Sequence, residues 1–92
     1  DAAMYMAIPH AVVTDPCDYA QLASVTRQTA DCDCVTYTRF VRKDIVQVYG
    51  DGSVFQLGKG VVLRESNCDA VTVIASGIMV DEALKAGELL ER

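Results

Sequence analysis

The hydrophobic and polar positions are most regular over residues 61–92, where they predict strand, turn, strand and helix in that order. Residues 61–63 and 70–75 are apolar runs on either side of a polar break, and the second run is continuous enough for a strand covered on both faces. Ser76-Gly77 permits the bend that follows, because glycine adopts backbone angles that other residues resist. From Met79 onward one helical face is apolar and the other charged. The apolar face comprises Val80, Ala83, Leu84, Gly87 and Leu90, and the charged face Asp81, Glu82, Lys85, Glu88 and Arg92.

Two pairs on the charged face support this helix. Asp81 with Lys85 and Glu88 with Arg92 are four residues apart with the acid first, which is the favourable order for a helical ion pair. The whole stretch reads as half of a doubly wound sheet with no partner strand after its helix. We therefore expect the chain to stop where such a domain would be starting.

Residues 1–40 predict a helix end, a strand, a helix and a second strand. Residues 1–6 resemble the last turns of a helix whose start is not present, and Ile8-Pro9 ends it, because proline disfavours helix in the residue before it. Residues 11–14 and 35–40 are rich in β-branched and aromatic side chains, as strands are. Between them, Asp15 as N-cap and Pro16 in the first turn predict a helix over residues 16–29. Its predicted buried stripe is Tyr19, Leu22, Ala23, Thr26 and Ala30.

This order is a βαβ pattern with parallel strands, so the predicted fold class is α/β, with covering helices. Residues 45–57 are less regular and suit either a hairpin or an extended linker with one turn. We divide the chain into residues 1–49, a linker over 50–60, and a second incomplete α/β unit over 61–92.

Composition narrows the function classes. The chain has 92 residues, a hydrophobic content of 51% and a mean hydropathy of +0.19, which suggest packing against further segments or a partner subunit. A net charge of −5 with scattered Lys and Arg argues against a nucleic-acid surface. No apolar run has the length of a membrane span, and no secretory signal opens the chain. We expect a cytoplasmic protein whose four cysteines are reduced thiols: Cys17, Cys32, Cys34 and Cys68.

An ordered set of short motifs resembles the transketolase family. In the first half these are Met4 ahead of Ile8-Pro9, Val12-Val13, Pro16-Cys17-Asp18, and Tyr37, Arg39-Phe40 and Arg42, which resemble the end of the pyrimidine-binding domain. In the second half they are Gly58-Lys59-Gly60, Val62-Leu63-Arg64, residues 71–75, residues 77–80 and Glu82-Ala83-Leu84, which resemble the start of the C-terminal domain. The separate C-terminal subunit of split transketolases is the most similar form.

The resemblance implies two-carbon ketol transfer between sugar phosphates, with thiamine diphosphate and a divalent cation in the full assembly. The family's catalytic glutamate and substrate histidines would lie upstream of Asp1, and the diphosphate and metal on another domain or subunit. We therefore expect no catalytic, cofactor-binding or metal-binding residue on this chain. Its implied partners are the remaining transketolase domains or subunit, in a homo- or hetero-oligomer.

Arg42 matches the family arginine that grips the phosphate of the sugar substrate. A guanidinium suits this role, because it offers phosphate oxygens a fork of permanently charged donors. Arg42 follows the carboxyl end of a predicted strand, where α/β sheets bind ligands. Arg39 has the same chemistry but falls within that predicted strand, so we rank it second.

Other candidate sites have simpler interpretations. Gly50-Asp51-Gly52 begins like the thiamine diphosphate metal motif, but no helix follows it and Asn67 comes too soon, so we interpret it as a turn. The cysteines lack the paired spacing of structural zinc. His10 is interpreted as a surface loop residue, and Ser76 lacks the surroundings of a nucleophile.

Two alternatives stay open beside the transketolase hypothesis. One is a non-catalytic fragment or degenerate interaction module of the same fold, since Cys34-Val35 and Val41 replace the Gly-Pro and Gly usual in the family. The other is a piece of deoxyxylulose-phosphate synthase or of a 2-oxo acid dehydrogenase beta chain, which share this architecture.

Overall fold

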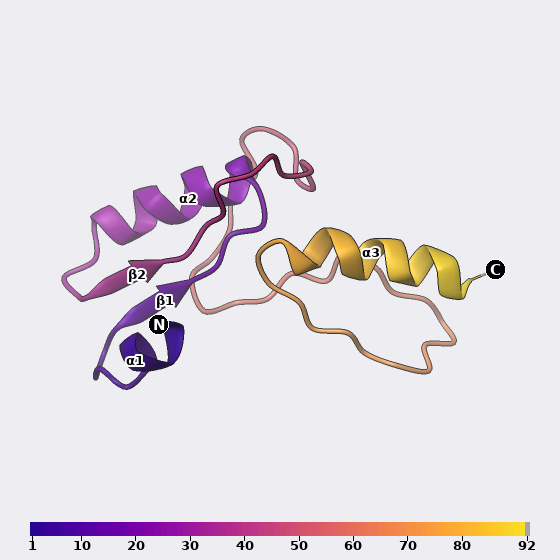
Figure 1. Ribbon diagram of the computed structural model, residues 1–92, viewed down its shortest axis with the longest axis horizontal. Helices are drawn as coiled ribbons and strands as arrows, with labels where there is room; N and C mark the ends of the chain where they lie inside the picture. Colours follow the sequence, from indigo (N-terminus) through magenta and orange to yellow (C-terminus); the bar gives the residue numbers. More distant parts are fainter. Residues whose placement is uncertain (92) are drawn as a thin grey trace.

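A parallel βαβ unit and a separate C-terminal helix dominate the computed structural model, which describes residues 1–91 (Figure 1). The elements in chain order are α1 (Ala2–Met6), β1 (Val12–Thr14), α2 (Tyr19–Ala30), β2 (Thr36–Thr38) and α3 (Met79–Leu90). None of the helices in this part of the chain is long and apolar enough to cross a membrane.

Strands β1 and β2 form a two-stranded parallel sheet joined through α2, so the predicted βαβ pattern and the α/β class are confirmed. The central pair of the register is Val13 with Tyr37. The Thr14 and Thr38 hydroxyls are 2.9 Å apart at the carboxyl edge. Helix α1 packs against β1, and the Tyr5 ring stacks on the Tyr37 ring with centroids 4.3 Å apart. The stacked pair of Tyr5 and Tyr37 therefore joins helix α1 to the sheet.

Helix α2 begins later than the sequence predicts. Its N-cap is Asp18, whose Oδ1 accepts a hydrogen bond from the Gln21 amide at 2.9 Å. The Gln21 side chain in turn accepts one from the Cys17 amide at 2.8 Å. This reciprocal arrangement resembles a capping box and satisfies two amides that the helix leaves unpaired. The prediction of Asp15 as N-cap is wrong, because that carboxylate is bonded elsewhere.

The buried face of α2 also differs from the prediction. Ser24 and Val25 are buried, whereas of the predicted stripe Leu22 is half-buried and the others are exposed, namely Tyr19, Ala23, Thr26 and Ala30. The segment that covers α2 is residues 48–57, an extended stretch with one turn at residues 51 and 52 (Figure 1). No strand forms within residues 45–57, so the hairpin is wrong and the segment is extended; the assignment of residues 50–60 as a linker between domains stays a prediction. The covering segment, rather than helical periodicity alone, determines which face is inside.

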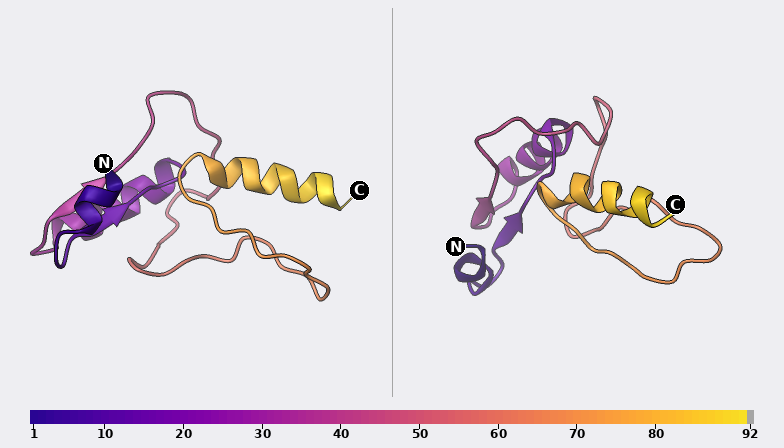
Figure 2. Two further views of the ribbon diagram at one scale, coloured as in Figure 1. Left: turned by 60° about the horizontal axis from the view of Figure 1, so that its bottom comes forward. Right: turned by 45° about the vertical axis from the view of Figure 1, so that its right-hand side comes forward.

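The strands predicted over residues 61–63 and 70–75 are absent from the described structure. Both segments belong to a loop that runs out and back beside α3 (Figure 2), and neither pairs with a strand within residues 1–91. The burial predicted for residues 70–75 is also wrong, since Val71 is 68% exposed and Ile74 94%. The physical reason is that a strand exists only through ladder hydrogen bonds to a neighbour. A continuous apolar run shows the capacity for such pairing, not its presence.

Helix α3 matches the prediction closely. Val80 is buried and Ala83, Leu84 and Gly87 are half-buried, although Leu90 at the end of the same face is 78% exposed. Lys85 pairs with Asp81 at 2.5 Å and with Glu82 at 3.0 Å. The predicted pairing of Glu88 with Arg92 lies outside the described residues. Arg64 of the returning loop pairs with Glu91 just past the helix, which attaches the loop to α3.

Candidate functional site

The residues that leave the two strands at their carboxyl edge form a polar cluster with a residue from the bend before α3. Asp15 follows β1 and Arg39 follows β2, and the Arg39 amide donates to the Thr14 carbonyl at 2.9 Å. The Arg39 guanidinium donates to the Asp15 carboxylate twice, at 2.6 Å from Nη2 to Oδ2 and 3.3 Å from Nε to Oδ1. Ser76, far along the chain, donates its hydroxyl to the same carboxylate at 2.8 Å. We call these three residues the Asp15 cluster.

Gly77 completes the attachment of the α3 corner to this edge. Its amide donates to the Asp15 carbonyl at 2.9 Å. Its φ is +56°, a left-handed conformation that glycine adopts more readily than other residues. A Cβ at this position would lie 2.7 Å from Asp15 Oδ1. The Ser-Gly bend expected from the sequence is therefore confirmed, and glycine is required there for two separate reasons.

The charges of the Asp15 cluster reinforce one another. Partial burial raises the pKa of Asp15, but the hydrogen bonds from Arg39 and Ser76 and the positive charge of Arg39 outweigh it, so the pKa lies below its usual 3.8. The hydrogen bond to Asp15, followed by its negative charge, raises the pKa of Arg39. Both groups are therefore charged at neutral pH, as an ion pair with a geometrically fixed arginine.

A groove of about 670 Å³ opens beside the cluster. Asp15, Arg39, Ser76 and Glu82 provide its polar groups. The remaining wall is mainly apolar and includes Val41, Val73, Ile74, Ile78 and Met79. The groove thus lies between the strand edge, the extended segment before the bend and the first turns of α3. A mainly apolar groove with a few polar groups is the usual character of a ligand site.

The two arginines singled out in the sequence have different surroundings. Arg39 lies immediately after β2, so its predicted position within the strand is wrong, and its guanidinium is committed to Asp15. Arg42 lies three residues further, in an exposed bend. Within residues 1–91 it forms no hydrogen bond or ion pair, and it is not part of the groove wall. Its guanidinium is therefore available to an anion from outside the described chain.

Asp18 is a buried carboxylate with more partners than its place in the sequence predicts. It is 1% exposed, and besides capping α2 its Oδ2 accepts hydrogen bonds from the amides of Val48 and Tyr49 at 2.9 and 2.7 Å. The Asp-x-x-Gln spacing was a local signal for the cap. No local signal pointed to the two amides, which lie about thirty residues downstream.

Ser24 and Gln28 continue this attachment about two and three turns further along α2. The Ser24 hydroxyl accepts from the Phe55 amide at 3.2 Å, and the Gln28 amide group donates to the Phe55 carbonyl at 2.5 Å. The Phe55 ring is buried and meets the Tyr49 ring edge-on at 4.5 Å. One polar stripe of α2 therefore holds both ends of the segment that crosses it.

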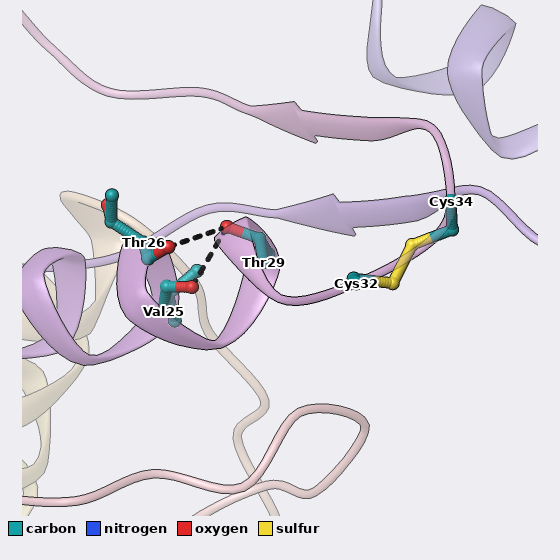
Figure 3. Close-up of a disulfide and its surroundings, with 5 residues drawn as sticks. All are labelled: Val25, Thr26, Thr29, Cys32 and Cys34. Atoms are coloured by element: carbon teal, nitrogen blue, oxygen red, sulfur yellow. Dashed lines mark hydrogen bonds between the residues drawn. A yellow bond between two sulfur atoms is a disulfide. The ribbon is translucent and has the colours of Figure 1, made fainter.

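The cysteines differ from the prediction of four reduced thiols. Cys32 and Cys34 form a disulfide with their Cα atoms 5.4 Å apart, in the loop between α2 and β2 (Figure 3). Cα atoms at that separation fall within the range a disulfide spans. Cys17 is a buried free thiol and Cys68 an exposed one, so Cys68 does not line a buried strand. Within residues 1–91 no group of three metal-ligating side chains is brought together.

His10 and the Gly-Asp-Gly segment lie in loops, as expected. His10 is exposed with a φ of +61°. Gly50 accepts a hydrogen bond from the Ser53 amide at 3.2 Å and Gly52 has a φ of +81°, which closes an ordinary turn. Neither feature has the surroundings of a catalytic or metal site.

The comparisons with known proteins identify the family. The chain is 38% identical, over 99% of its length, to a protein of Methanocaldococcus jannaschii named as a transketolase C-terminal section. It is 39% identical over 98% of its length to the 6-deoxy-6-sulfo-D-fructose transketolase subunit of Clostridium sp. strain MSTE9. It is 32% identical over its whole length to human transketolase. No family model and no solved structure matches the chain.

The matches cover nearly all of this chain but only part of each relative. The chain spans 29% of the Methanocaldococcus protein, 27% of the Clostridium subunit and 15% of human transketolase. Three relatives of different size are thus matched from one end of this chain to the other. The chain is therefore homologous, over nearly its whole length, to a part of transketolases, and these relatives support a transketolase C-terminal fragment.

Proposed function

We propose that this chain works as part of a thiamine diphosphate-dependent transketolase that transfers two-carbon ketol units between sugar phosphates. The observation that carries the proposal is the end-to-end similarity to proteins named transketolase, at 30–39% identity. Because the chain spans under a third of its first relatives, the activity belongs to a larger assembly with the remaining transketolase domains or subunit. We propose a cytoplasmic homo- or hetero-oligomer of that kind.

The proposed contribution of this chain is substrate positioning by Arg42. The guanidinium is exposed, follows the carboxyl edge of β2 and has no partner among residues 1–91. A sugar phosphate brought to that edge would meet a fork of charged donors that match its oxygens. Arg39 is the weaker candidate, since releasing it for a phosphate would cost its two hydrogen bonds to Asp15.

The division into a pyrimidine-binding unit over residues 1–49 and a C-terminal unit over residues 61–92 is part of this proposal. The βαβ unit and α3 are separated by a long stretch without helix or strand, which supports such a division. In the proposed assembly, the unpaired apolar run at residues 70–75 would receive neighbouring strands from the rest of the enzyme.

The described residues do not fit the cofactor. Thiamine diphosphate requires a cation held by oxygen ligands, and no metal-ligating group of three is assembled within residues 1–91. The Gly50-Asp51-Gly52 turn leads into the segment bound along α2 instead of into a helix. We therefore assign the cofactor and its divalent cation to other parts of the assembly, and no step of catalysis to this chain.

The proposal is tested by ketol transfer in the complete assembly, with wild type, Arg42→Ala and the neighbouring exposed control Lys43→Ala. Losing one charged pair of hydrogen bonds to phosphate should raise KM for a phosphorylated sugar roughly tenfold or more, because such bonds are worth about 1.5–3 kcal/mol. KM for a sugar without phosphate should stay unchanged. An unchanged KM for sugar phosphate in the Arg42 variant removes Arg42 from the site.

Absence of ketol transfer from every assembly that contains this chain would favour a non-catalytic interaction module of the same fold. Turnover of a 2-oxo acid, or formation of deoxyxylulose phosphate, would instead place the chain with the two related enzyme groups. Each outcome is read from the products of one incubation with a mixture of donors and acceptors.

A second candidate substrate class follows from one relative. The Clostridium protein at 39% identity is named for 6-deoxy-6-sulfo-D-fructose. A sulfonate offers a guanidinium three acceptor oxygens and one negative charge, so Arg42 suits it as well as a phosphate. Comparing kcat/KM for fructose 6-phosphate and its 6-deoxy-6-sulfo analogue in the same assembly decides between the two classes.

A further inference from the structure

The Cys32–Cys34 disulfide closes a very small loop at a solvent-accessible place. The two cysteines are separated by Asp33 alone, both are half-buried, and they lie between the end of α2 and the start of β2 (Figure 3). A bridge over so few residues restricts the unfolded chain far less than one that closes a long loop. Its contribution to holding the fold together is accordingly small.

The chain on either side of the bridge is held by other bonds. The Cys32 amide donates to the Thr29 carbonyl at 3.2 Å, and the Thr29 hydroxyl donates back to the Val25 and Thr26 carbonyls, which secures the last turn of α2 (Figure 3). The Val35 carbonyl accepts from the Val12 amide at 2.8 Å, which secures the start of β2. Both ends of the loop therefore keep their positions when the sulfur–sulfur bond opens.

We propose that Cys32 and Cys34 are a reversible redox pair that exchanges electrons with thiols of the surrounding medium or of a dithiol protein. In the reducing direction a partner thiolate attacks one of the two sulfurs, forms a mixed disulfide and releases the other as a thiolate, which takes up a proton. A second partner thiol then attacks the mixed disulfide and frees the first sulfur. In total the Cys32–Cys34 bond gains two electrons and two protons, and two partner thiols become a disulfide.

The acidic residues around the pair influence which thiols react. Asp31 and Asp33 are exposed and flank Cys32 directly. Their charges repel an approaching anion, so glutathione, which carries net negative charge, should reduce the bridge more slowly than an uncharged dithiol such as dithiothreitol. The Asp31→Asn and Asp33→Asn variants should narrow this difference in rate.

The experiment counts free thiols in the complete protein at a series of glutathione redox ratios, with rapid alkylation and peptide mass analysis. Trypsin cuts after Arg27 and Arg39, so residues 28–39 form one peptide that contains Cys32 and Cys34 and no other cysteine. We expect this peptide to carry no alkyl group at oxidising ratios and two at reducing ratios. The change should reverse when the ratio is returned. Circular dichroism should be the same at both extremes.

Matched variants make the result unambiguous. Cys32→Ser and Cys34→Ser each leave one thiol in the peptide of residues 28–39, which takes one alkyl group or one glutathione but never forms the internal bridge. Cys68→Ser keeps the transition, because Cys68 is a free exposed thiol outside the pair. The proposal is overturned if the peptide stays in one state at all ratios. It is also overturned if reduction removes the helical signal, since the bond would then be structural.

Discussion

The Asp15 carboxylate receives two hydrogen bonds from the Arg39 guanidinium, 2.6 Å from Nη2 to Oδ2 and 3.3 Å from Nε to Oδ1. The two residues leave neighbouring parallel strands at the same edge, which brings them together although they are 24 positions apart. The same carboxylate also binds the Ser76 hydroxyl at 2.8 Å. One side chain therefore joins both strand ends to the bend that begins α3.

We expect Gly77→Ala to destabilise the complete protein by about 2 kcal/mol or more from its positive φ alone. The new methyl group would also approach Asp15 Oδ1 to 2.7 Å. Adding Asp15→Ala to Gly77→Ala should restore only the stability that is lost through this contact with the carboxylate. Chemical denaturation of the two single variants and the double variant measures the coupling.

Gly60→Ala is the control for this prediction, because a Cβ at Gly60 meets nothing within 4 Å and its φ is not positive. It should change stability by no more than about 0.5 kcal/mol. Equal effects at Gly77 and Gly60 would contradict the close packing of the bend on Asp15.

Acid should weaken the Asp15 cluster at a defined pH. The pKa of Asp15 in the folded protein lies below its ordinary 3.8, since the bonds from Arg39 and Ser76 outweigh partial burial. A depressed carboxyl pKa stabilises the folded state fully above the unfolded pKa, and this stabilisation is lost as pH falls through the folded pKa. The stability difference between wild type and Asp15→Asn should thus be constant near neutral pH and shrink below about pH 4.

The measurement is the free energy of unfolding of both proteins from neutral to acidic pH. The exposed control Asp51→Asn should give a profile parallel to that of the wild type. A difference that stays constant into strong acid would show that the Asp15 charge contributes nothing to the folded state.

Asp18→Ala should be the most damaging substitution of an acidic residue in this chain. It removes the α2 cap and leaves the partly buried amides of Val48 and Tyr49 without their acceptor. Together these losses should lower the free energy of unfolding by about 2–4 kcal/mol. Hydrogen exchange should speed up specifically at Val48 and Tyr49. Asp31→Ala, at the exposed end of the same helix, is the matched control and should leave these two amides protected.

The local parts of the fold were predictable, and the parts that depend on distant partners were not. Helix α3 and the βαβ order follow from apolar periodicity and β-branched content within short windows. The choice of Asp18 over Asp15 as N-cap depends on Val48, Tyr49, Arg39 and Ser76, all of which are remote in sequence. Locally, Asp15 followed by Pro16 fits one rule for a helix start, and Asp18 three residues before Gln21 fits another.

The same distinction applies to the candidate site and to the missing strands. The chemistry of Arg39 and Arg42 was evident from the sequence, but only the structure shows that Asp15 engages Arg39 and leaves Arg42 free within residues 1–91. Residues 70–75 have the composition of a buried strand, yet Ile74 is 94% exposed. Composition indicates which segments can pair; a ladder also requires a neighbouring strand at the right distance.

The two free thiols should differ strongly in reactivity. Cys17 is 4% exposed, and burial, followed by the negative charge of Asp18, raises its pKa from 9.0 to about 11. The thiolate is the reacting form, so at pH 8 its fraction at Cys17 should be about one hundredth of that of an ordinary thiol. Burial slows access of the reagent further. The rate of alkylation by iodoacetamide, followed by mass analysis of the two tryptic peptides, should therefore be far higher at Cys68.

Asp18→Asn should raise the rate at Cys17, because it removes the second cause of the pKa shift, while the rate at Cys68 stays constant as an internal control. Similar rates at the two cysteines in the folded protein would show that Cys17 is not held in the buried position between Pro16 and the α2 cap.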